Sequence, residues 1–483
     1  MKYVSTRDAS IVKTFREALC SGYAPDGGLF VPQSVPKVDR GTLEEWSKLS
    51  FGELAFTVLR SFIADAEVPD EDLREICEGA LSGFSDPDII PVRKVGPIHV
   101  AELFHGPTYC FKDLGMRVLL QLLQYFSKDR SRTLLVSTTG DTGPAAVRAV
   151  VDGPPCLRIL VHYPDGQISD FQRKQLTTIQ SPRVKVVAFE GGGDDMDAPI
   201  KKLLAEHPDE YTGVNSYNIG RPLMQMVHFV WTYLRVSPDF ETPLDIILPT
   251  GAMGNIAGGY LARQMGVPIG RLVAAVNAND ISYRALTQGD FSRAPEMLQT
   301  LSEAINIQVP YNFERLLYYV TDGDHSLIKE WMTQMEQTQR LQLPDPWLSR
   351  FRDHFGSARV TDEDMCMALR ATKDKFGYWT DPHTAVAFSG ASQLGYLDRE
   401  EPVALLATAS PCKFEHAVTV AVGAEGWTEY VQSDAYPGSA HTILQANEIP
   451  PVVYKARGSL LESLVAWEAQ AKELLAEHWD ATE

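Results

Sequence analysis

The chain has 483 residues, of which 44% are hydrophobic and 22% charged, and its formal net charge is −19 at pH 7. This length exceeds what one hydrophobic core usually holds and predicts about three domain-sized units, and the composition is that of a globular protein rather than a disordered or fibrous one. The negative charge disfavours binding to nucleic acids or anionic membranes, because phosphate groups are bound by clustered Lys and Arg.

The spacing of the cysteines and the character of the N-terminus indicate the cellular compartment. The cysteines are scattered along the chain at Cys20, Cys77, Cys110, Cys156, Cys366 and Cys412. They form no Cys-x-x-Cys pair and no zinc-site spacing, so we expect reduced thiols and no bound metal. The polar N-terminus lacks the apolar core of a signal peptide, and no apolar run of about 18 residues occurs. We therefore expect a cytoplasmic, soluble protein.

Residues 1–95 are predicted to form a helical N-terminal domain. A glycine-rich turn at residues 22–28 precedes helical patterning over residues 43–66 and 73–84, and the region has little sign of strands.

From residue 96 onward, short β-rich runs alternate with glycine turns and helical stretches. Near-continuous apolar strands followed by helices indicate parallel sheets covered on both faces, so the predicted fold class is α/β. The expected strands cover residues 98–103, 133–137, 157–161, 184–189, 245–248, 272–276 and 403–407.

Three other segments are predicted to have structural roles. Residues 191–195, three glycines and two aspartates, predict a strand-to-helix turn. Residues 280–375 are rich in helix formers and predict helices inserted before the last strand. Residues 460–475 place an apolar stripe on a C-terminal helix, which indicates core or subunit contact.

Lys112 ends a turn-bearing segment, residues 102–113, in which it is the one basic group. Burial against Phe104, Tyr109 and Phe111 would penalise the ammonium form and lower the lysine pKa, as a Schiff base with an aldehyde requires. The alternative is an ordinary surface lysine. His105, in the same segment, and His383 are acid–base candidates, although most such histidines serve packing or loop geometry.

Three further segments could bind anions. Residues 136–146 offer hydroxyls and backbone N–H groups at a helix start, where Asp141 could also be a plain N-cap. Residues 215–225 present Arg221 and Gln225 on one helical face, and Arg221 could grip a phosphate or carboxylate or form a structural ion pair.

The third segment is a glycine loop, residues 248–260, that joins an apolar strand to a helix. Gly251 and Gly254 would let a phosphate approach the helix N-terminus, or they could serve a tight turn with close helix packing. The loop matches neither the dinucleotide nor the Walker motif, which disfavours a nucleotide-binding protein. Thr408, just past the last strand, could hydrogen-bond a pyridine nitrogen or be a plain strand-end hydroxyl.

Taken together in chain order, these windows resemble threonine synthase of the long-chain bacterial and fungal type, and look closest to the threonine synthase-like proteins of animals. The resemblance covers residues 3–7, 24–32, 102–113, 137–146, 163–175, 215–225, 251–255, 381–385 and 408–414, and it thins over residues 280–375 and after 420.

The resemblance implies a fold-type-II enzyme, similar to tryptophan synthase β, whose cofactor is pyridoxal 5'-phosphate (PLP). It implies two parallel-sheet α/β domains. The expected organisation is an N-terminal helical domain of residues 1–95, a large PLP-binding domain of residues 96–130 and 226–435 with a helical insertion at about 280–375, a small substrate domain of residues 131–225 and a helical tail of residues 436–483.

By the same resemblance, Lys112 would form the internal aldimine with PLP. The implied cofactor site is Lys112, Phe111, Gly251, Ala252, Met253, Gly254, Asn255 and Thr408, and the implied substrate site is Ser137, Thr138, Thr139, Asp141, Thr142, Asn215, Asn218 and Arg221. The implied activity is that of a carbon–oxygen lyase of amino-acid metabolism and threonine biosynthesis. It would eliminate phosphate from O-phosphohomoserine or a close γ-substituted amino acid to give threonine. The expected partner is this small phosphorylated substrate, with a monomer or homodimer as the assembly.

The chain departs from the family pattern at Asp8, Thr139, Ala252, Ser410 and Cys412, where Gly, Ser, Asn, His and Ala are usual. Because Thr139 and Ser410 lie near the expected cofactor edge, these changes leave other outcomes open. The alternatives are release of 2-oxobutyrate and ammonia, replacement by another nucleophile, and a PLP-binding protein without turnover.

Overall fold

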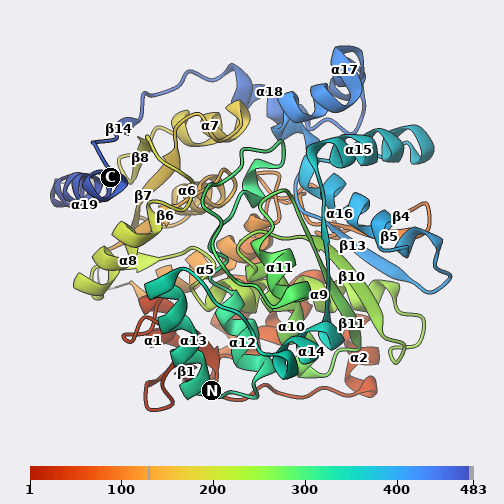
Figure 1. Cartoon of the computed structure of the whole chain (residues 1–483), viewed down its shortest axis with the longest axis horizontal. Coiled ribbons are helices and arrows are strands. Elements are labelled where there is room, and N and C mark those ends of the chain that lie inside the picture. Colours follow the sequence, from red (N-terminus) through yellow and green to blue (C-terminus); the bar gives the residue numbers. More distant parts are fainter. Residues whose placement is uncertain (129–130, 478–483) are drawn as a thin grey trace.

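Two sheets form the framework of the computed structural model, which describes residues 1–128 and 131–477 (Figure 1). The six-stranded sheet runs in the order β12 (Phe355–Arg359), β11 (Ile269–Val276), β10 (Leu244–Pro249), β13 (Val403–Ala407), β5 (Ile98–Glu102) and β4 (Val92–Val95). The five-stranded sheet runs in the order β14 (Val452–Tyr454), β8 (Val184–Phe189), β7 (Leu157–Pro164), β6 (Arg132–Ser137) and β9 (Tyr211–Gly213). Apart from the antiparallel β4–β5 pair, the paired strands of both sheets are parallel, which confirms the predicted α/β class.

Helices connect these strands, and one more helix follows β14. They are α5 (Lys112–Phe126), α6 (Thr142–Asp152), α7 (Asp170–Thr177), α8 (Asp197–Glu206), α9 (Gly220–Val236), α10 (Gly254–Met265), α11 (Ile281–Gln288), α12 (Phe313–Val320), α13 (His325–Thr338), α14 (Asp345–His354), α15 (Asp362–Phe376), α16 (Pro382–Gln393), α17 (Glu415–Gln432), α18 (Gly438–Gln445) and α19 (Leu460–Ala476). Short 3₁₀ turns occupy η1 (Glu303–Ile305), η2 (Tyr396–Asp398) and η3 (Pro411–Lys413). No helix among the described residues has the length and apolar character needed to cross a lipid bilayer.

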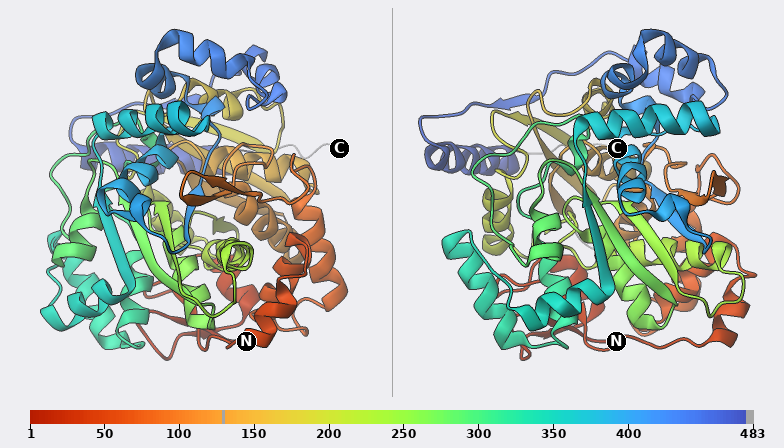
Figure 2. Two further views of the ribbon diagram at one scale, coloured as in Figure 1. Left: turned by 90° about the vertical axis from the view of Figure 1, so that its right-hand side faces the viewer. Right: turned by 45° about the vertical axis from the view of Figure 1, so that its right-hand side comes forward.

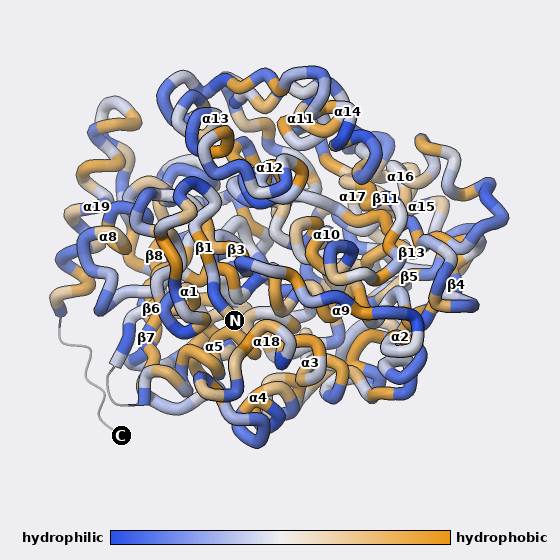
Figure 3. Tube along the Cα trace, turned by 90° about the horizontal axis from the view of Figure 1, so that it is seen from below, coloured by the Kyte–Doolittle hydropathy of each residue, from blue (hydrophilic) through white to orange (hydrophobic). Residues whose placement is uncertain are grey.

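Both faces of the six-stranded sheet are buried. Ile246 and Leu248 of β10 belong to the core that includes residues of α9 and α10, while Ile247 between them joins Val386 and Phe388 of α16 in a second core. Successive side chains of a strand point to opposite faces, so burial of both faces explains why these strands read as continuous apolar runs. In Figure 3 the apolar positions gather on the central strands and helices, and hydrophilic stretches lie on outer turns.

The N-terminal region differs from the prediction. It contains α2 (Arg40–Trp46), α3 (Phe51–Arg60) and α4 (Asp70–Leu81) near the predicted helical stretches. It also contains a helix that was not predicted, α1 (Phe15–Ser21), and an antiparallel sheet of β2 (Val12–Lys13), β1 (Tyr3–Ser5) and β3 (Phe30–Pro32). These strands have two or three residues each, too few for an alternating pattern to be recognised.

The predicted strands from residue 96 onward are all present, whereas β9, β12 and β14 were not predicted. The predicted boundary at residue 225 falls inside α9, which packs against α10 and α5, so a boundary before α9 fits the packing better. The tail is not purely helical, because β14 extends the five-stranded sheet beyond β8 on the way from α18 to α19 (Figure 2). The described tail ends at residue 477, and the remainder of the predicted range 436–483, like residues 129–130, lies outside the described residues.

Candidate functional site

The predicted site residues come together where strands end and helices begin. Lys112 is the first residue of α5, Thr142 the first of α6, Arg221 the second of α9 and Asn255 the second of α10. The first N–H groups of a helix have no intrahelical partner, and the helix dipole is positive at that end. The convergence of several such ends gives this region a local positive potential, which favours anions, in a protein of net charge −19.

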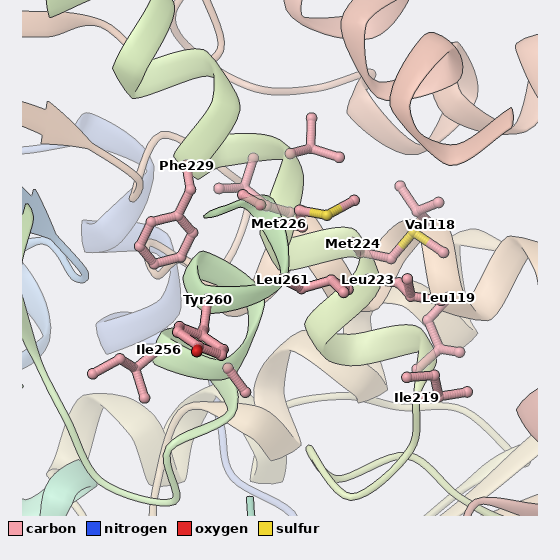
Figure 4. Close-up of a cluster of buried hydrophobic side chains, with 14 of the residues drawn as sticks. Val118, Leu119, Ile219, Leu223, Met224, Met226, Phe229, Ile256, Tyr260 and Leu261 are labelled. Atoms are coloured by element: carbon pink, nitrogen blue, oxygen red, sulfur yellow. The ribbon is translucent and has the colours of Figure 1, made fainter. Parts of the chain in front are cut away.

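A shared core holds these helix ends in place. Apolar side chains of α5, α9 and α10 interdigitate behind them (Figure 4). The labelled members are Val118, Leu119, Ile219, Leu223, Met224, Met226, Phe229, Ile256, Tyr260 and Leu261. Gly258 and Gly259 let α10 approach α9 closely, since an added Cβ on Gly258 would lie 2.9 Å from the carbonyl oxygen of Pro222.

Lys112 lines an internal cavity together with Phe111 and the glycine loop of residues 251–255. Its side chain is half-buried, and its Nζ lies 4.7 Å from the centre of the Phe111 ring. Burial, assisted by the positive charge of Arg221, lowers the pKa of Lys112 to about 8. The amine is therefore partly neutral near physiological pH, and the alternative of an ordinary surface lysine is wrong.

The glycine loop forms another wall of this cavity through Gly251, Ala252, Met253, Gly254 and Asn255. Met253 adopts a left-handed conformation with φ of 61°, a strained geometry for a non-glycine residue at a helix N-cap. An added Cβ on Gly254 would lie 2.6 Å from Cβ of Ser216, so this glycine is required by packing within the protein. The glycine loop is thus a tight turn with close packing, as one of the two alternatives predicted, and it also borders the cavity at a helix N-terminus.

Thr408 lines the cavity from the end of β13. Its carbonyl oxygen accepts a hydrogen bond of 2.8 Å from the backbone N–H of Phe111, so the segment that precedes Lys112 is tied to the strand end.

The hydroxyl segment after β6 contributes Ser137, Thr139, Asp141 and Thr142 to the cavity. Thr138 does not line it, because its buried hydroxyl accepts hydrogen bonds from the backbone N–H groups of Gly140 and Gly143. Asp141 occupies the N-cap position of α6 without making a capping hydrogen bond, so the plain N-cap alternative is wrong.

Of the two asparagines predicted as site residues before α9, one lines the cavity and the other does not. Asn215 lines the cavity and its amide bonds the backbone of Ser137. Asn218 does not line it, because its fully buried amide donates to the carbonyl oxygens of Leu19 and Gly213.

Arg221 is fully buried and is not among the cavity-lining residues, and its Nη1 donates to the carbonyl oxygen of Val214 at 2.9 Å. Its Nε and Nη2 have no hydrogen-bond partner among the described residues, and no carboxylate there forms an ion pair with it. Burial lowers its pKa to about 10, which leaves the guanidinium charged. Unpaired buried donors on a cation indicate an anionic ligand, and the structural ion-pair alternative finds no acid partner in the described part of the chain.

Several residues in or next to the cavity wall were not predicted from the sequence. Lys413 is fully buried, and its Nζ lies 2.7 Å from Oδ1 of Asp141 and 3.0 Å from the carbonyl oxygen of Thr108. Burial opposes the charge of Asp141, but the neighbouring Lys413 ammonium outweighs it and lowers the pKa of the carboxyl. Lys413 is the one charged residue among residues 403–414, which is the same signal that identified Lys112.

The turn of residues 191–195, which was assigned no chemistry, places Gly193 and Asp194 in the cavity wall, and Asp197 follows at the start of α8. Burial raises the pKa of Asp194 to about 6 and that of Asp197 well above its usual range. Residues Ala304, Ile305, Ile307 and Tyr311 complete the wall from the inserted segment.

The two histidine candidates have structural partners. His383 reaches the cavity edge, but its Nδ1 lies 2.7 Å from Oδ2 of Asp381 and its Nε2 accepts from the backbone N–H of Ala304. His105 pairs with Glu102 through Nε2 at 2.8 Å and lines a separate groove. Both side chains hold local geometry.

Comparison with known proteins shows which proteins share this sequence and fold. Residues 2–81 match the family model described as threonine synthase N terminus, and residues 93–409 match that of pyridoxal-phosphate dependent enzyme. Human threonine synthase-like 2 is 39% identical over 435 residues, which cover 87% of this chain and 89% of that protein. The crystal structure of yeast threonine synthase superposes with a TM-score of 0.87 at 30% identity, covering 99% of both chains. PLP-bound threonine synthase from Brucella melitensis gives 0.84 at 31% identity, covering 97% of this chain and 100% of that one.

The cavity fits the cofactor of this family, which is PLP. An amine of lowered pKa suits its aldehyde, and the start of α10 suits its phosphate. Unpartnered buried atoms facing this region, Nδ2 of Asn255, Oγ of Ser137 and Oε1 of Gln225, leave hydrogen-bonding capacity for a ligand. The matched models, the relatives and the shared fold together show that the chain belongs to the threonine synthase family of pyridoxal-phosphate-dependent enzymes.

Proposed function

We propose that the protein is a PLP-dependent carbon–oxygen lyase that releases phosphate from O-phosphohomoserine, or a close γ-substituted amino acid, and forms threonine. The observation that carries the proposal is the pairing, at converging helix ends, of an amine whose pKa is about 8 with a buried arginine that has two unpartnered nitrogen atoms. The first suits covalent attachment of the cofactor, and the second suits an anionic substrate. The names of the relatives support the choice of reaction.

When bound, PLP supplies an electron sink that makes protons on the carbons of an amino acid removable. In the proposed site, residues 251–255 would hold its phosphate, Phe111 would contact its ring and Thr408 would hydrogen-bond its pyridine nitrogen. Lys112 would hold the cofactor through its amine. Nζ of Lys112 would also move protons between substrate carbons, which is efficient when its pKa is close to the working pH.

The substrate would lie between the hydroxyl segment and the start of α9. Ser137, Thr139, Thr142 and Asn215 line the cavity and offer hydrogen bonds to its anionic groups. Arg221, which lies behind the lining residues, supplies the positive charge. Asp141 orients the region through its ion pair with Lys413. Thr138 and Asn218 act indirectly, by fixing the backbone from which Thr139 and Arg221 project.

The test is product analysis with O-phosphohomoserine and the PLP-loaded protein. We expect phosphate and threonine to appear in equal amounts. Lys112→Ala should lower the rate by about 10²–10⁴-fold, because the proton-transfer group is lost. Lys94→Ala, which alters an exposed lysine on β4, should leave the rate unchanged.

Other products would change or refute the proposed function. Phosphate with 2-oxobutyrate and ammonia would assign a phospho-lyase, and the departures at Thr139 and Ser410 are the feature that favours this second candidate. Phosphate with a different amino acid would indicate replacement by another nucleophile. No phosphate release from fully loaded protein would make the chain a PLP-binding protein without turnover.

A further inference from the structure

A buried histidine lies directly behind the glycine loop. His228, on α9, is fully buried, and its Nε2 is 2.7 Å from Oδ1 of Asn255 at the start of α10. His228 is not among the cavity-lining residues, whereas Asn255 is. Burial lowers the pKa of His228 to about 4, so the ring is neutral at physiological pH.

The contact determines which ring nitrogen carries the proton. An amide oxygen only accepts hydrogen bonds, so Nε2 of His228 must be the donor. Nδ1 of His228 has no partner among the described residues, which agrees with its being the unprotonated nitrogen of a neutral ring. The histidine thus offers Asn255 one N–H group and no charge.

The contact also determines how the Asn255 amide faces the cavity. Because Oδ1 is held by His228, the other end of the amide is the Nδ2 donor, which is buried and has no partner within the described chain. Asn255 is the second residue of α10, where the backbone N–H groups also lack intrahelical partners. The Nδ2 group therefore adds a side-chain donor to an existing set of backbone donors.

We propose that His228 is a positioning residue for cofactor binding: it holds the Asn255 amide with its N–H₂ group toward the phosphate of PLP and prevents the amide from turning its oxygen there. An amide is close to symmetric in shape, so packing alone selects its orientation weakly, and a hydrogen-bond partner decides it. With the donor of His228 removed, the amide is free to rotate, and its oxygen would face a phosphate with like partial charge.

The test compares PLP with pyridoxal, which has the same ring and aldehyde but no phosphate. His228→Phe keeps an aromatic ring and removes the N–H donor. We expect this variant of the full-length apoprotein to bind PLP about tenfold more weakly and pyridoxal with unchanged affinity, as for the loss of one hydrogen bond to a charged group. His228→Gln, which retains an N–H donor, should recover most of the affinity for PLP. Equilibrium titration of each apoprotein measures these affinities.

A double-variant cycle with Asn255→Ala completes the test. In the Asn255→Ala background, His228→Phe should have no further effect on PLP affinity, since the group that it orients is absent. Equal weakening of PLP and pyridoxal, an effect that adds to that of Asn255→Ala, or no effect at all would overturn the proposal. If His228→Phe does not fold, His228→Met provides a donor-free variant for the same comparison. No substrate is present, so the result is independent of which reaction the enzyme catalyses.

Discussion

The electrostatic state of Lys112 depends on a few neighbouring side chains. Burial and the Arg221 guanidinium lower its pKa to about 8, while the Asp141 carboxylate acts in the opposite direction. The influence of Asp141 is limited because Lys413, 2.7 Å away, neutralises it. Arg221 has no such partner in the described residues, so its charge acts on the amine undiminished.

Replacing Arg221 should therefore shift the reactivity of Lys112 with pH. The neutral amine is the nucleophile, and its fraction rises as pH increases through the pKa. In Arg221→Met the positive charge is gone, so the pKa of Lys112 rises from about 8 and covalent capture of pyridoxal requires a higher pH. Borohydride trapping of pyridoxal on the apoprotein across a pH series measures this midpoint. Arg235→Met, at the other end of α9, is the control, and equal midpoints for both variants would contradict the argument.

At the scale of elements, the site is an assembly of helix N-termini joined across the chain. The Asp141–Lys413 pair links the start of α6 to η3, and Lys413 also bonds the carbonyl oxygen of Thr108 in the segment before α5. Gln172 of α7 donates to the same carboxylate at 2.9 Å. One buried ion pair thus holds together segments that contribute to the cofactor and substrate sides of the cavity.

Removing only the positive charge of the Asp141–Lys413 pair should lower the free energy of unfolding more than removing both charges. Lys413→Met leaves the Asp141 carboxylate buried without its cation, and we expect a loss of about 3–5 kcal/mol in the free energy of unfolding. Lys413→Met combined with Asp141→Asn should lose less than Lys413→Met alone, because no uncompensated charge remains. Denaturant unfolding of the cofactor-free proteins measures both, and cofactor removal prevents ligand binding from contributing. A double variant less stable than Lys413→Met would contradict this expectation.

At the scale of the whole molecule, the C-terminal segment belongs to the five-stranded sheet. β14 pairs with β8, and Trp467 of α19 is fully buried against Phe189, with ring centres 5.4 Å apart. Nε1 of Trp467 also donates to the carbonyl oxygen of Lys455. The sheet that carries the hydroxyl segment is therefore stabilised by residues from the far end of the chain.

Trp467→Ala should destabilise the packing of α19 against the five-stranded sheet. Removing a buried tryptophan costs about 3–5 kcal/mol, and the cost falls on the contact between α19 and the five-stranded sheet. Hydrogen exchange in β14 and β8 should accelerate, while exchange in the six-stranded sheet should change little. Leu461→Ala lies on the same helix at a side chain that is 72% exposed, and we expect it to change stability by no more than about 0.5 kcal/mol. Equal protection in both variants would show that the tail does not support the sheet.

Features that depend on local patterns could be predicted from the order of the amino acids. The apolar runs from β5 to β13, the turns after them and the isolated Lys112 are properties of neighbouring residues, so the α/β class and the lysine were predicted. The order of matching windows likewise identified the family.

Contacts between side chains from separate segments became known from the folded arrangement. Lys413 reaches Asp141, and His228 reaches Asn255, from segments distant in the chain, and no local pattern encodes such pairs. Thr138 and Asn218 lie in the predicted segments, yet they turn to backbone partners because those donors and acceptors must be satisfied when buried. The short strands β2 and β3 form by pairing with opposite edges of β1. In each case packing and hydrogen-bond satisfaction set the direction of a side chain or the pairing of a strand, and these depend on the assembled fold.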